Sequence, residues 1–267
     1  GYASFTGRAY LYNGGASMNN VSDVTFLGEA GTGDFGISVS EAGDINGDGF
    51  SDLIIGAEDY NSNGRAYIFN GSAQTDNIPD KYITGEALND NFGCSVSSAG
   101  DVNGDGYFDF IAGAELNDAG GSSAGRVYLY MNMLIGVDTE DLIFDGEDTT
   151  DNFGYSVASA GDVNGDGYDD VIVGAKLNDE NGNIAGKSYI YFGGLNIDYV
   201  ADVTMTGVAA GDQFGYSVAG AGDVNGDGYD DVIVGAPFND AVNNSAGRAY
   251  VFYGGAAMNN TADVTLS

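Results

Sequence analysis

The sequence contains no histidine, no tryptophan and a single cysteine, Cys94. Without histidine, neither a Ser-His-Asp nor a Cys-His nucleophilic system can form. A lone cysteine forms no disulfide within the chain, so it does not indicate a redox compartment. Cys94 aligns with Ile37, Tyr155 and Tyr216 in the repeats described below, and we expect an ordinary strand residue there. No phosphate-binding glycine motif is present either, and we therefore predict that the protein is not an enzyme.

Basic residues are also scarce. Seven Lys and Arg stand against forty Asp and Glu, which gives a net charge of −33. Such a polyanion repels nucleic acid and anionic lipid and attracts cations. No apolar run is long enough to cross a bilayer, so we expect neither membrane insertion nor a nucleic-acid partner. No signal peptide is recognisable, which predicts a mature or trimmed chain.

Proline occurs only twice in 267 residues, whereas glycine occurs 45 times. This favours many tight turns over a proline-rich linker. A hydrophobic content of 43% with 12% aromatics allows a substantial core. Both values argue against the disorder that the net charge alone would suggest.

One acidic decapeptide occurs four times. GDVNGDGYDD stands at 161–170 and again at 222–231, with looser copies at 43–52 and 100–109. The copies are 57, 61 and 61 residues apart. A period of this length is typical of a propeller or a solenoid.

The similarity extends to both sides of each decapeptide. Phe-Gly and an alternating run precede it, and an apolar run ending in Gly-Ala follows. A basic-aromatic run and a weaker fourth run complete the unit. These runs are rich in β-branched and aromatic residues and are bounded by Gly, Asn and Asp, which predicts strands. We therefore predict an all-β chain, a β-propeller of four-stranded antiparallel blades.

The two ends of the chain share a sequence. Residues 7–25 nearly repeat at 247–265. The chain is thus predicted to form a single propeller domain, 1–267, of about four and a half blades: a half blade at 1–28 and blades at about 29–85, 86–146, 147–207 and 208–267. In a four-bladed ring the two similar hairpins would compete for one place, so the spare hairpin could join a neighbouring chain.

Each decapeptide has the pattern D-x-N-x-D-G-x-x-D. Side-chain oxygens at positions 1, 3, 5 and 9 and the carbonyl at position 7 can surround Ca²⁺. Glycine at position 6 permits the sharp reversal, and closely spaced carboxylates repel one another unless a cation lies between them. We predict four calcium sites, made by Asp44, Asn46, Asp48, Phe50 and Asp52; Asp101, Asn103, Asp105, Tyr107 and Asp109; Asp162, Asn164, Asp166, Tyr168 and Asp170; and Asp223, Asn225, Asp227, Tyr229 and Asp231.

The main alternative is an Asn-Gly or Asp-Gly turn with a solvated acidic face, which four copies in register make less plausible. The pattern also resembles an EF-hand or a dockerin, but it departs from them in two ways. The flanks are strands rather than helices. Position 12 holds Ile55, Ala112, Val173 and Val234 instead of the bidentate glutamate, so Asp at position 9 would be the last ligand.

Phe-Gly, an Asp-rich loop and Gly-Ala-x in this order resemble the FG-GAP repeat of integrin α-subunit propellers. In that family the calcium loop joins the first and second strands of a blade, and the propeller has seven blades. Only Gly235-Ala236-Pro237 completes the GAP motif in this chain. The resemblance implies an extracellular, calcium-bearing module for adhesion, with a protein or glycan ligand on the face opposite the calcium loops.

Two other functions remain open. The duplicated hairpin suggests a self-assembling filament or surface-layer subunit, and some fungal lectins are similar calcium-bearing propellers. Weak calcium sites fill only where calcium is abundant, which favours a secreted or cell-surface location. The basic residues that open each third strand are expected to pair with acids of their own blade: Arg8, Arg65, Arg126, Lys187 and Arg248. Glycosylation sequons occur at about the chance frequency, at Asn20, Asn70, Asn243 and Asn259.

Overall fold

The computed structural model describes residues 6–16, 19–29, 33–131, 140–241 and 246–267; the sequon at Asn243 lies outside this part. The described residues form an all-β structure whose one helical element is a 3₁₀ turn at Tyr60–Ser62. Among them, no helix has the length and apolar character needed to span a membrane.

The strands form four four-stranded sheets and one two-stranded sheet, all with antiparallel neighbours. The sheets are β1 (Arg8–Leu11) and β2 (Val24–Leu27); β3 (Val39–Gly43), β4 (Asp52–Ala57), β5 (Arg65–Phe69) and β6 (Lys81–Thr84); β7 (Phe92–Gly100), β8 (Asp109–Ala114), β9 (Arg126–Tyr130) and β10 (Leu142–Asp145); β11 (Phe153–Gly161), β12 (Asp170–Ala175), β13 (Lys187–Tyr191) and β14 (Val203–Thr206); and β15 (Ser217–Gly222), β16 (Asp231–Ala236), β17 (Arg248–Phe252) and β18 (Val264–Leu266).

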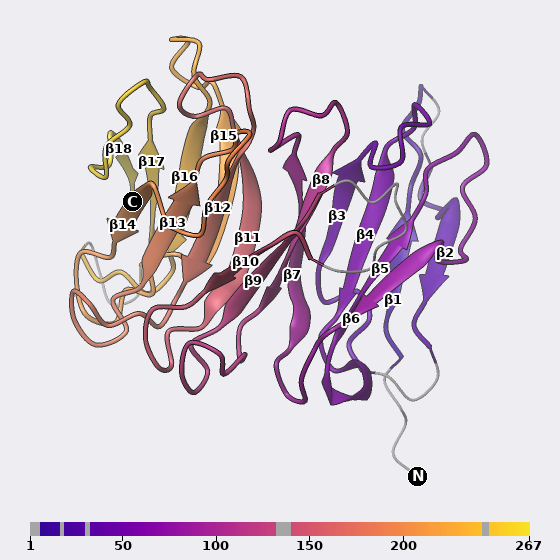
Figure 1. Cartoon of the computed structure of the whole chain (residues 1–267), viewed down its shortest axis with the longest axis horizontal. Coiled ribbons are helices and arrows are strands. Elements are labelled where there is room, and N and C mark those ends of the chain that lie inside the picture. The colour runs from indigo at the N-terminus through magenta and orange to yellow at the C-terminus, as the bar shows by residue number, and fades with distance from the viewer. Residues whose placement is uncertain (1–5, 17–18, 30–32, 132–139, 242–245) are drawn as a thin grey trace.

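The predicted all-β, four-stranded antiparallel blades are therefore confirmed. The sheets follow one another from the β1–β2 pair at one end to β15–β18 at the other (Figure 1). Neighbouring first strands β3, β7, β11 and β15 contact one another in turn. The sheets thus share an axis, but among the described strands no sheet joins the two ends into a closed ring.

The second strand of each sheet lies in the core. Every residue of β8 and β12 is buried, because a sheet covers each of their faces. A phenylalanine from each Phe-Gly packs edge-on against a tyrosine of the third strand in the same sheet. The ring centroids are 5.2 Å apart for Phe35–Tyr67, 5.3 Å for Phe92–Tyr128, 5.1 Å for Phe153–Tyr189 and 5.5 Å for Phe214–Tyr250.

The glycine of the first three Gly-Ala pairs is required by the contact between sheets. A Cβ on Gly113 would lie 2.0 Å from the carbonyl oxygen of Gly154 in the next first strand. The Ser95 hydroxyl donates to this same oxygen at 2.7 Å. Only a residue without a side chain lets the two main chains approach this closely.

The first strands differ in length. β7 and β11 begin at the Phe-Gly phenylalanine, whereas β3 and β15 begin later, at Val39 and Ser217. The runs after Phe35 and Phe214 therefore form strand over fewer residues than the runs after Phe92 and Phe153. β7 and β11 each have a neighbouring first strand on both sides, whereas β3 and β15 have one on a single side.

Candidate functional site

The four Asp-rich decapeptides lie where the resemblance placed them, between the first and second strands of each sheet. The loops cover residues 44–51, 101–108, 162–169 and 223–230, which we call the first to fourth loops. Because the same connection recurs in sheets that share an axis, the four loops lie at one end of the structure.

Each loop wraps around the carboxylate of its first aspartate. In the third loop, Asp162 Oδ1 accepts the N–H groups of Gly165 at 2.7 Å and Asp166 at 3.0 Å. Its Oδ2 accepts the N–H of Gly167 at 2.9 Å. Asn164 Oδ1 accepts the N–H of Asp166 at 2.8 Å. The same bonds recur in the other three loops, so position 1 organises the turn.

The aspartate at position 9 has a second role that sequence reasoning missed. Asp170 is fully buried, and its Oδ2 accepts the N–H of Val163 at 2.9 Å. Its Oδ1 accepts the N–H of Gly193, after β13, at 2.8 Å. Asp52 and Asp231 make the same pair of bonds. Position 9 therefore connects the loop to the chain that follows the third strand.

Burial and neighbouring charge act on this carboxylate together. Burial, together with the charges of Asp166 and Asp162, raises the pKa of Asp170 to about 7, although the hydrogen bonds from Gly193 and Val163 act in the opposite direction. The pKa of Asp52 is raised for the same reasons. Three carboxylates thus interact closely, with no cation in the loop sequence to balance them.

The donor set fits a hard cation that takes only oxygen ligands. Within the described ranges, however, no three acidic side chains are arranged to hold a metal ion. Their oxygens face loop N–H groups instead, as Asp162 shows. Calcium binding at the predicted residues remains a prediction.

Successive loops are in direct contact. The Tyr229 ring of the fourth loop packs against Gly165 of the third. A Cβ on Gly165 would lie only 2.4 Å from Cε1 of this ring. Tyr168 covers Gly104 in the same way, and Tyr107 covers Gly47. The tyrosine at position 7 was predicted only as a carbonyl ligand, yet its side chain covers the neighbouring loop.

Hydrogen bonds join the same loops. Asp230 Oδ2 accepts the N–H of Asp162 at 3.0 Å, and Asp169 Oδ2 accepts that of Asp101 at 2.8 Å. At the junction of the first two loops the aspartate is replaced by Phe108, whose N–H donates to the Asp44 carbonyl at 3.3 Å. The loops therefore form a connected row.

The fourth loop differs because no further loop follows it within the described chain. Asp223 and Asn225 are exposed, whereas Asp162 and Asn164 are half-buried. A Cβ on Gly226 would have no neighbour within 4 Å. The fourth candidate site is thus the one that solvent reaches most easily.

Buried Asp–Asn pairs occupy the opposite end of three sheets. Each aspartate lies two residues before the Phe-Gly phenylalanine and accepts the Asn Nδ2 at 2.6 Å: Asp90–Asn117, Asp151–Asn178 and Asp212–Asn239. These pairs hold the connection before the first strand against the connection after the second. The two residues of each pair are 27 positions apart in the sequence. With forty Asp and Glu in the chain, this spacing did not single them out.

Replacing Asp151 should change how stability depends on pH. Burial raises the pKa of Asp151 from 3.8 to about 6. The folded chain therefore binds more protons than the unfolded chain between these values, and stability falls as pH rises through this interval. Asp151→Asn keeps the acceptor for Asn178 but cannot ionise. We expect the variant's melting temperature, relative to wild type, to rise by a few degrees between pH 4 and 7.

The matched control is Asp198→Asn, an exposed site at which the same chemical change is made. Its melting curves should follow those of wild type at every pH. Parallel pH profiles for Asp151→Asn and wild type would contradict the assignment of this dependence to Asp151.

A pocket of about 460 Å³ opens at this same end, near the shared axis. It is lined by Ile37, Glu58, Cys94, Glu115, Tyr155, Tyr216 and Ser217. Lys176 Nζ lies 3.3 Å from a Glu115 oxygen and 3.1 Å from the centre of the Tyr155 ring. Burial, followed by the charge of Glu115, raises the pKa of Glu58. Burial also raises the pKa of Cys94 to about 12, which keeps its thiol protonated and unreactive.

Three of the repeated basic residues pair with acids as predicted. Arg65 lies 3.1 Å from Glu29, Arg126 lies 2.7 Å from Glu86, and Lys187 lies 2.7 Å from Glu147. In the last sheet the corresponding acid position holds Val208, so this ion pair cannot form. Arg8 makes no ion pair with any described residue.

Comparison with known proteins agrees with this geometry. The FG-GAP repeat matches residues 35–69, 92–130, 153–191 and 214–252. The chain is 32% identical to integrin alpha-4 of Xenopus laevis over 252 residues, which are 89% of this chain and 23% of the relative. It is 34% identical to integrin alpha-5 of Xenopus laevis, over 61% of this chain and 15% of the relative. For integrin alpha-7 of Mus musculus the identity is 35%, over 69% and 15%. The chain spans less than a quarter of these relatives, and it belongs to the FG-GAP repeat family.

Proposed function

We propose that the chain is a non-catalytic, extracellular FG-GAP unit that binds a protein or glycan ligand and contains four structural Ca²⁺ ions. The observation that carries the proposal is the division of chemistry between the two ends. Four oxygen-rich loops lie at one end, and an acidic and aromatic pocket lies at the other. Loops at the ends of a rigid β scaffold commonly bind ligands.

Calcium binding can be tested by counting ions. Isothermal titration calorimetry should give about four Ca²⁺ per chain, with Kd on the order of 10⁻⁴ M. Asp162→Asn with Asp166→Asn should remove one ion, because both carboxylates of the third loop lose their charge. The paired control, Asp76→Asn with Asp198→Asn, removes two exposed acids elsewhere. No calcium uptake, or equal loss in the control, would contradict the metal assignment.

Ligand binding at the opposite end is proposed for the pocket around Glu58. Lys176 already pairs with Glu115, whereas Glu58 makes no ion pair or hydrogen bond with a described residue. A ligand with a cationic or hydroxyl group could supply that partner, and the exposed rings of Tyr216 and Phe238 lie close together beside it, 6.4 Å apart.

The test is a screen of the full chain on a glycan array and on immobilised matrix proteins. Any ligand found should bind Glu58→Gln at least tenfold more weakly, and Asp76→Asn as wild type does. Binding only to glycans would favour the lectin alternative, and a silent array would contradict it. A ligand unaffected by Glu58→Gln would contradict the pocket assignment.

Self-assembly remains a second candidate because of one observation. The β1–β2 hairpin has the same register as β17–β18: Tyr10 pairs with Thr25, and Tyr250 pairs with Thr265. A surface that fits one hairpin should therefore fit the other. Light scattering of the full chain in calcium should then show mass that increases with concentration, and a constant monomer mass would contradict this function.

A further inference from the structure

The β1–β2 sheet is an incomplete blade. In each four-stranded sheet, the third strand lies between the second and fourth strands. β1 corresponds to a third strand, yet among the described residues it pairs only with β2. The Leu11 carbonyl accepts the N–H of Asp23 in the chain leading to β2, at 2.9 Å. Along a strand, the N–H and C=O groups of successive residues point to opposite neighbouring strands. Those of Leu11 point to β2, so those of Tyr10 point to the open edge of β1.

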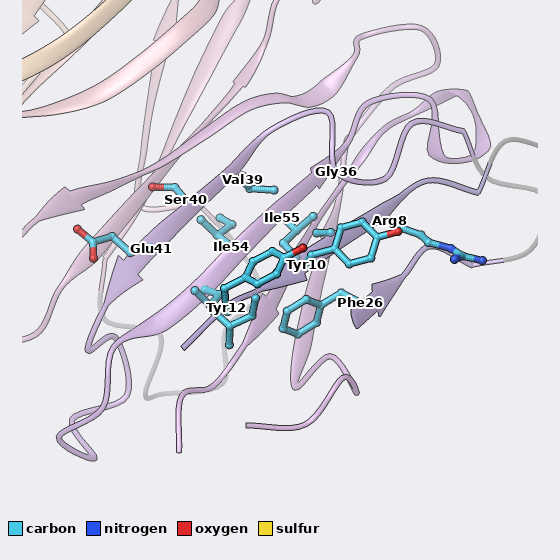
Figure 2. Close-up of a pocket in the computed structure, with 13 residues that line it drawn as sticks. Arg8, Tyr10, Tyr12, Phe26, Gly36, Val39, Ser40, Glu41, Ile54 and Ile55 are labelled. Atoms are coloured by element: carbon cyan, nitrogen blue, oxygen red, sulfur yellow. The ribbon is translucent and has the colours of Figure 1, made fainter. Parts of the chain in front are cut away.

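A groove of about 590 Å³ lies beside this edge. Figure 2 shows Tyr10, Tyr12 and Phe26 from the β1–β2 segment together with Val39, Ile54 and Ile55 from β3–β4. We call these six residues the β1 groove. It is mainly apolar, and it occupies the place where the first two strands of a blade would lie.

The complete sheets show what normally covers these side chains. Tyr10 is 52% exposed, whereas the equivalent tyrosines are 1–5% exposed: Tyr67, Tyr128, Tyr189 and Tyr250. Each of those four packs against a Phe-Gly phenylalanine. Val39 is 59% exposed, whereas its equivalents Val96 and Val157 are 6% and 8% exposed. Among the described residues, the groove therefore lacks the Phe-Gly phenylalanine and the apolar second strand that cover these positions in a complete sheet.

Charge points to the same occupant. Arg65, Arg126 and Lys187 each pair with a glutamate six residues before the Phe-Gly phenylalanine of their own sheet. Arg8 occupies the equivalent place as the first residue of β1, and it is exposed. A strand pair that begins with this glutamate would supply the acid that Arg8 lacks.

We propose that the β1 groove binds the first two strands of a further FG-GAP repeat, from a polypeptide segment outside these 267 residues. The segment carries a glutamate, Phe-Gly, an Asp-rich loop and an apolar strand that ends in Gly-Ala. A second copy of the chain is a poorer source, because each of its four such strand pairs is already covered by its own third and fourth strands. Exchange would replace one contact with another of the same kind. The proposal goes beyond the proposed ligand and calcium sites.

The chain provides the probe for the test. A peptide of residues 147–176 carries Glu147, Phe153, the third loop and its second strand. In calcium, we expect it to bind the full chain with 1:1 stoichiometry by calorimetry. Peptide Phe153→Ala and chain Tyr10→Ala should each weaken binding at least tenfold, and the double change should cost no more than either alone, because both remove one contact.

Residues 208–237 provide a matched peptide, because Val208 stands in place of the glutamate. This peptide should bind several-fold more weakly than peptide 147–176, and Arg8→Gln in the chain should remove the difference. Absence of binding, or equal binding to wild type and Tyr10→Ala, would overturn the proposal. So would calcium-dependent oligomers of the unmodified chain that the peptide dissociates, since the occupant would then be a second copy.

Discussion

Removing calcium is expected to lower the melting temperature of the chain by about 20 °C or more. A site with Kd near 10⁻⁴ M, at about 100 times that concentration of free Ca²⁺, contributes about 2.7 kcal/mol. Four such sites would contribute about 11 kcal/mol, which is comparable with the whole stability of an ordinary domain. The measurement is calorimetric melting in calcium and after exhaustive chelation with EDTA.

The physical reason lies in the loops. Without a cation, Asp170 remains buried beside Asp162 and Asp166, and their mutual repulsion opposes folding. Mg²⁺ at equal concentration should restore less stability than Ca²⁺, because it requires a stricter octahedron. Equal melting temperatures with and without EDTA would contradict a structural role for calcium.

Phe153→Ala should destabilise the chain by about 3–5 kcal/mol, the cost of truncating a buried aromatic residue. Phe153 is 1% exposed, and its ring lies edge-on to Tyr189 at 5.1 Å. Its N–H also donates to the carbonyl of Ala124 in the preceding sheet at 2.9 Å. The change therefore leaves a cavity at the junction of two sheets, and urea unfolding would measure its effect.

Phe50→Ala is the control for this variant. Phe50 is 45% exposed and is predicted to use only its main-chain carbonyl in the first loop. Stability and calcium stoichiometry should both change little, by less than about 0.5 kcal/mol for stability. A loss equal to that of Phe153→Ala would show that exposure does not distinguish the two positions.

Much of the fold could be predicted because each sheet is encoded locally and repeatedly. The alternation after Phe-Gly, the apolar second strand and the Gly-Ala ending all have direct structural causes, such as the approach of Gly154 to Gly113. The loops could be located for the same reason. The roles of Asp170 and Tyr229 could not be predicted, because both depend on contacts with residues far away in the sequence.

The ends of the repeat array were harder to predict. Sequence similarity treats Tyr10 and Tyr250 as equivalent, yet one is 52% exposed and the other 5%. Their difference comes from what lies beside them rather than from their own sequence. The shorter first strands of the outer sheets have the same cause, since the period of a sequence does not indicate how many neighbouring sheets each strand has.

The contacts between loops give the row a direction. Each of the first three loops is covered by a tyrosine from the next loop, whereas no described residue covers the fourth in this way. Asp230 of the fourth loop accepts the N–H of Asp162 in the third loop. An ion that orders Asp162 therefore also orders its contact with the fourth loop. Calcium binding to the row should thus be cooperative between neighbouring loops, as in a one-dimensional lattice, and the Hill coefficient for calcium should exceed one. Under gradual calcium depletion of these 267 residues, the ion of the fourth loop should leave first.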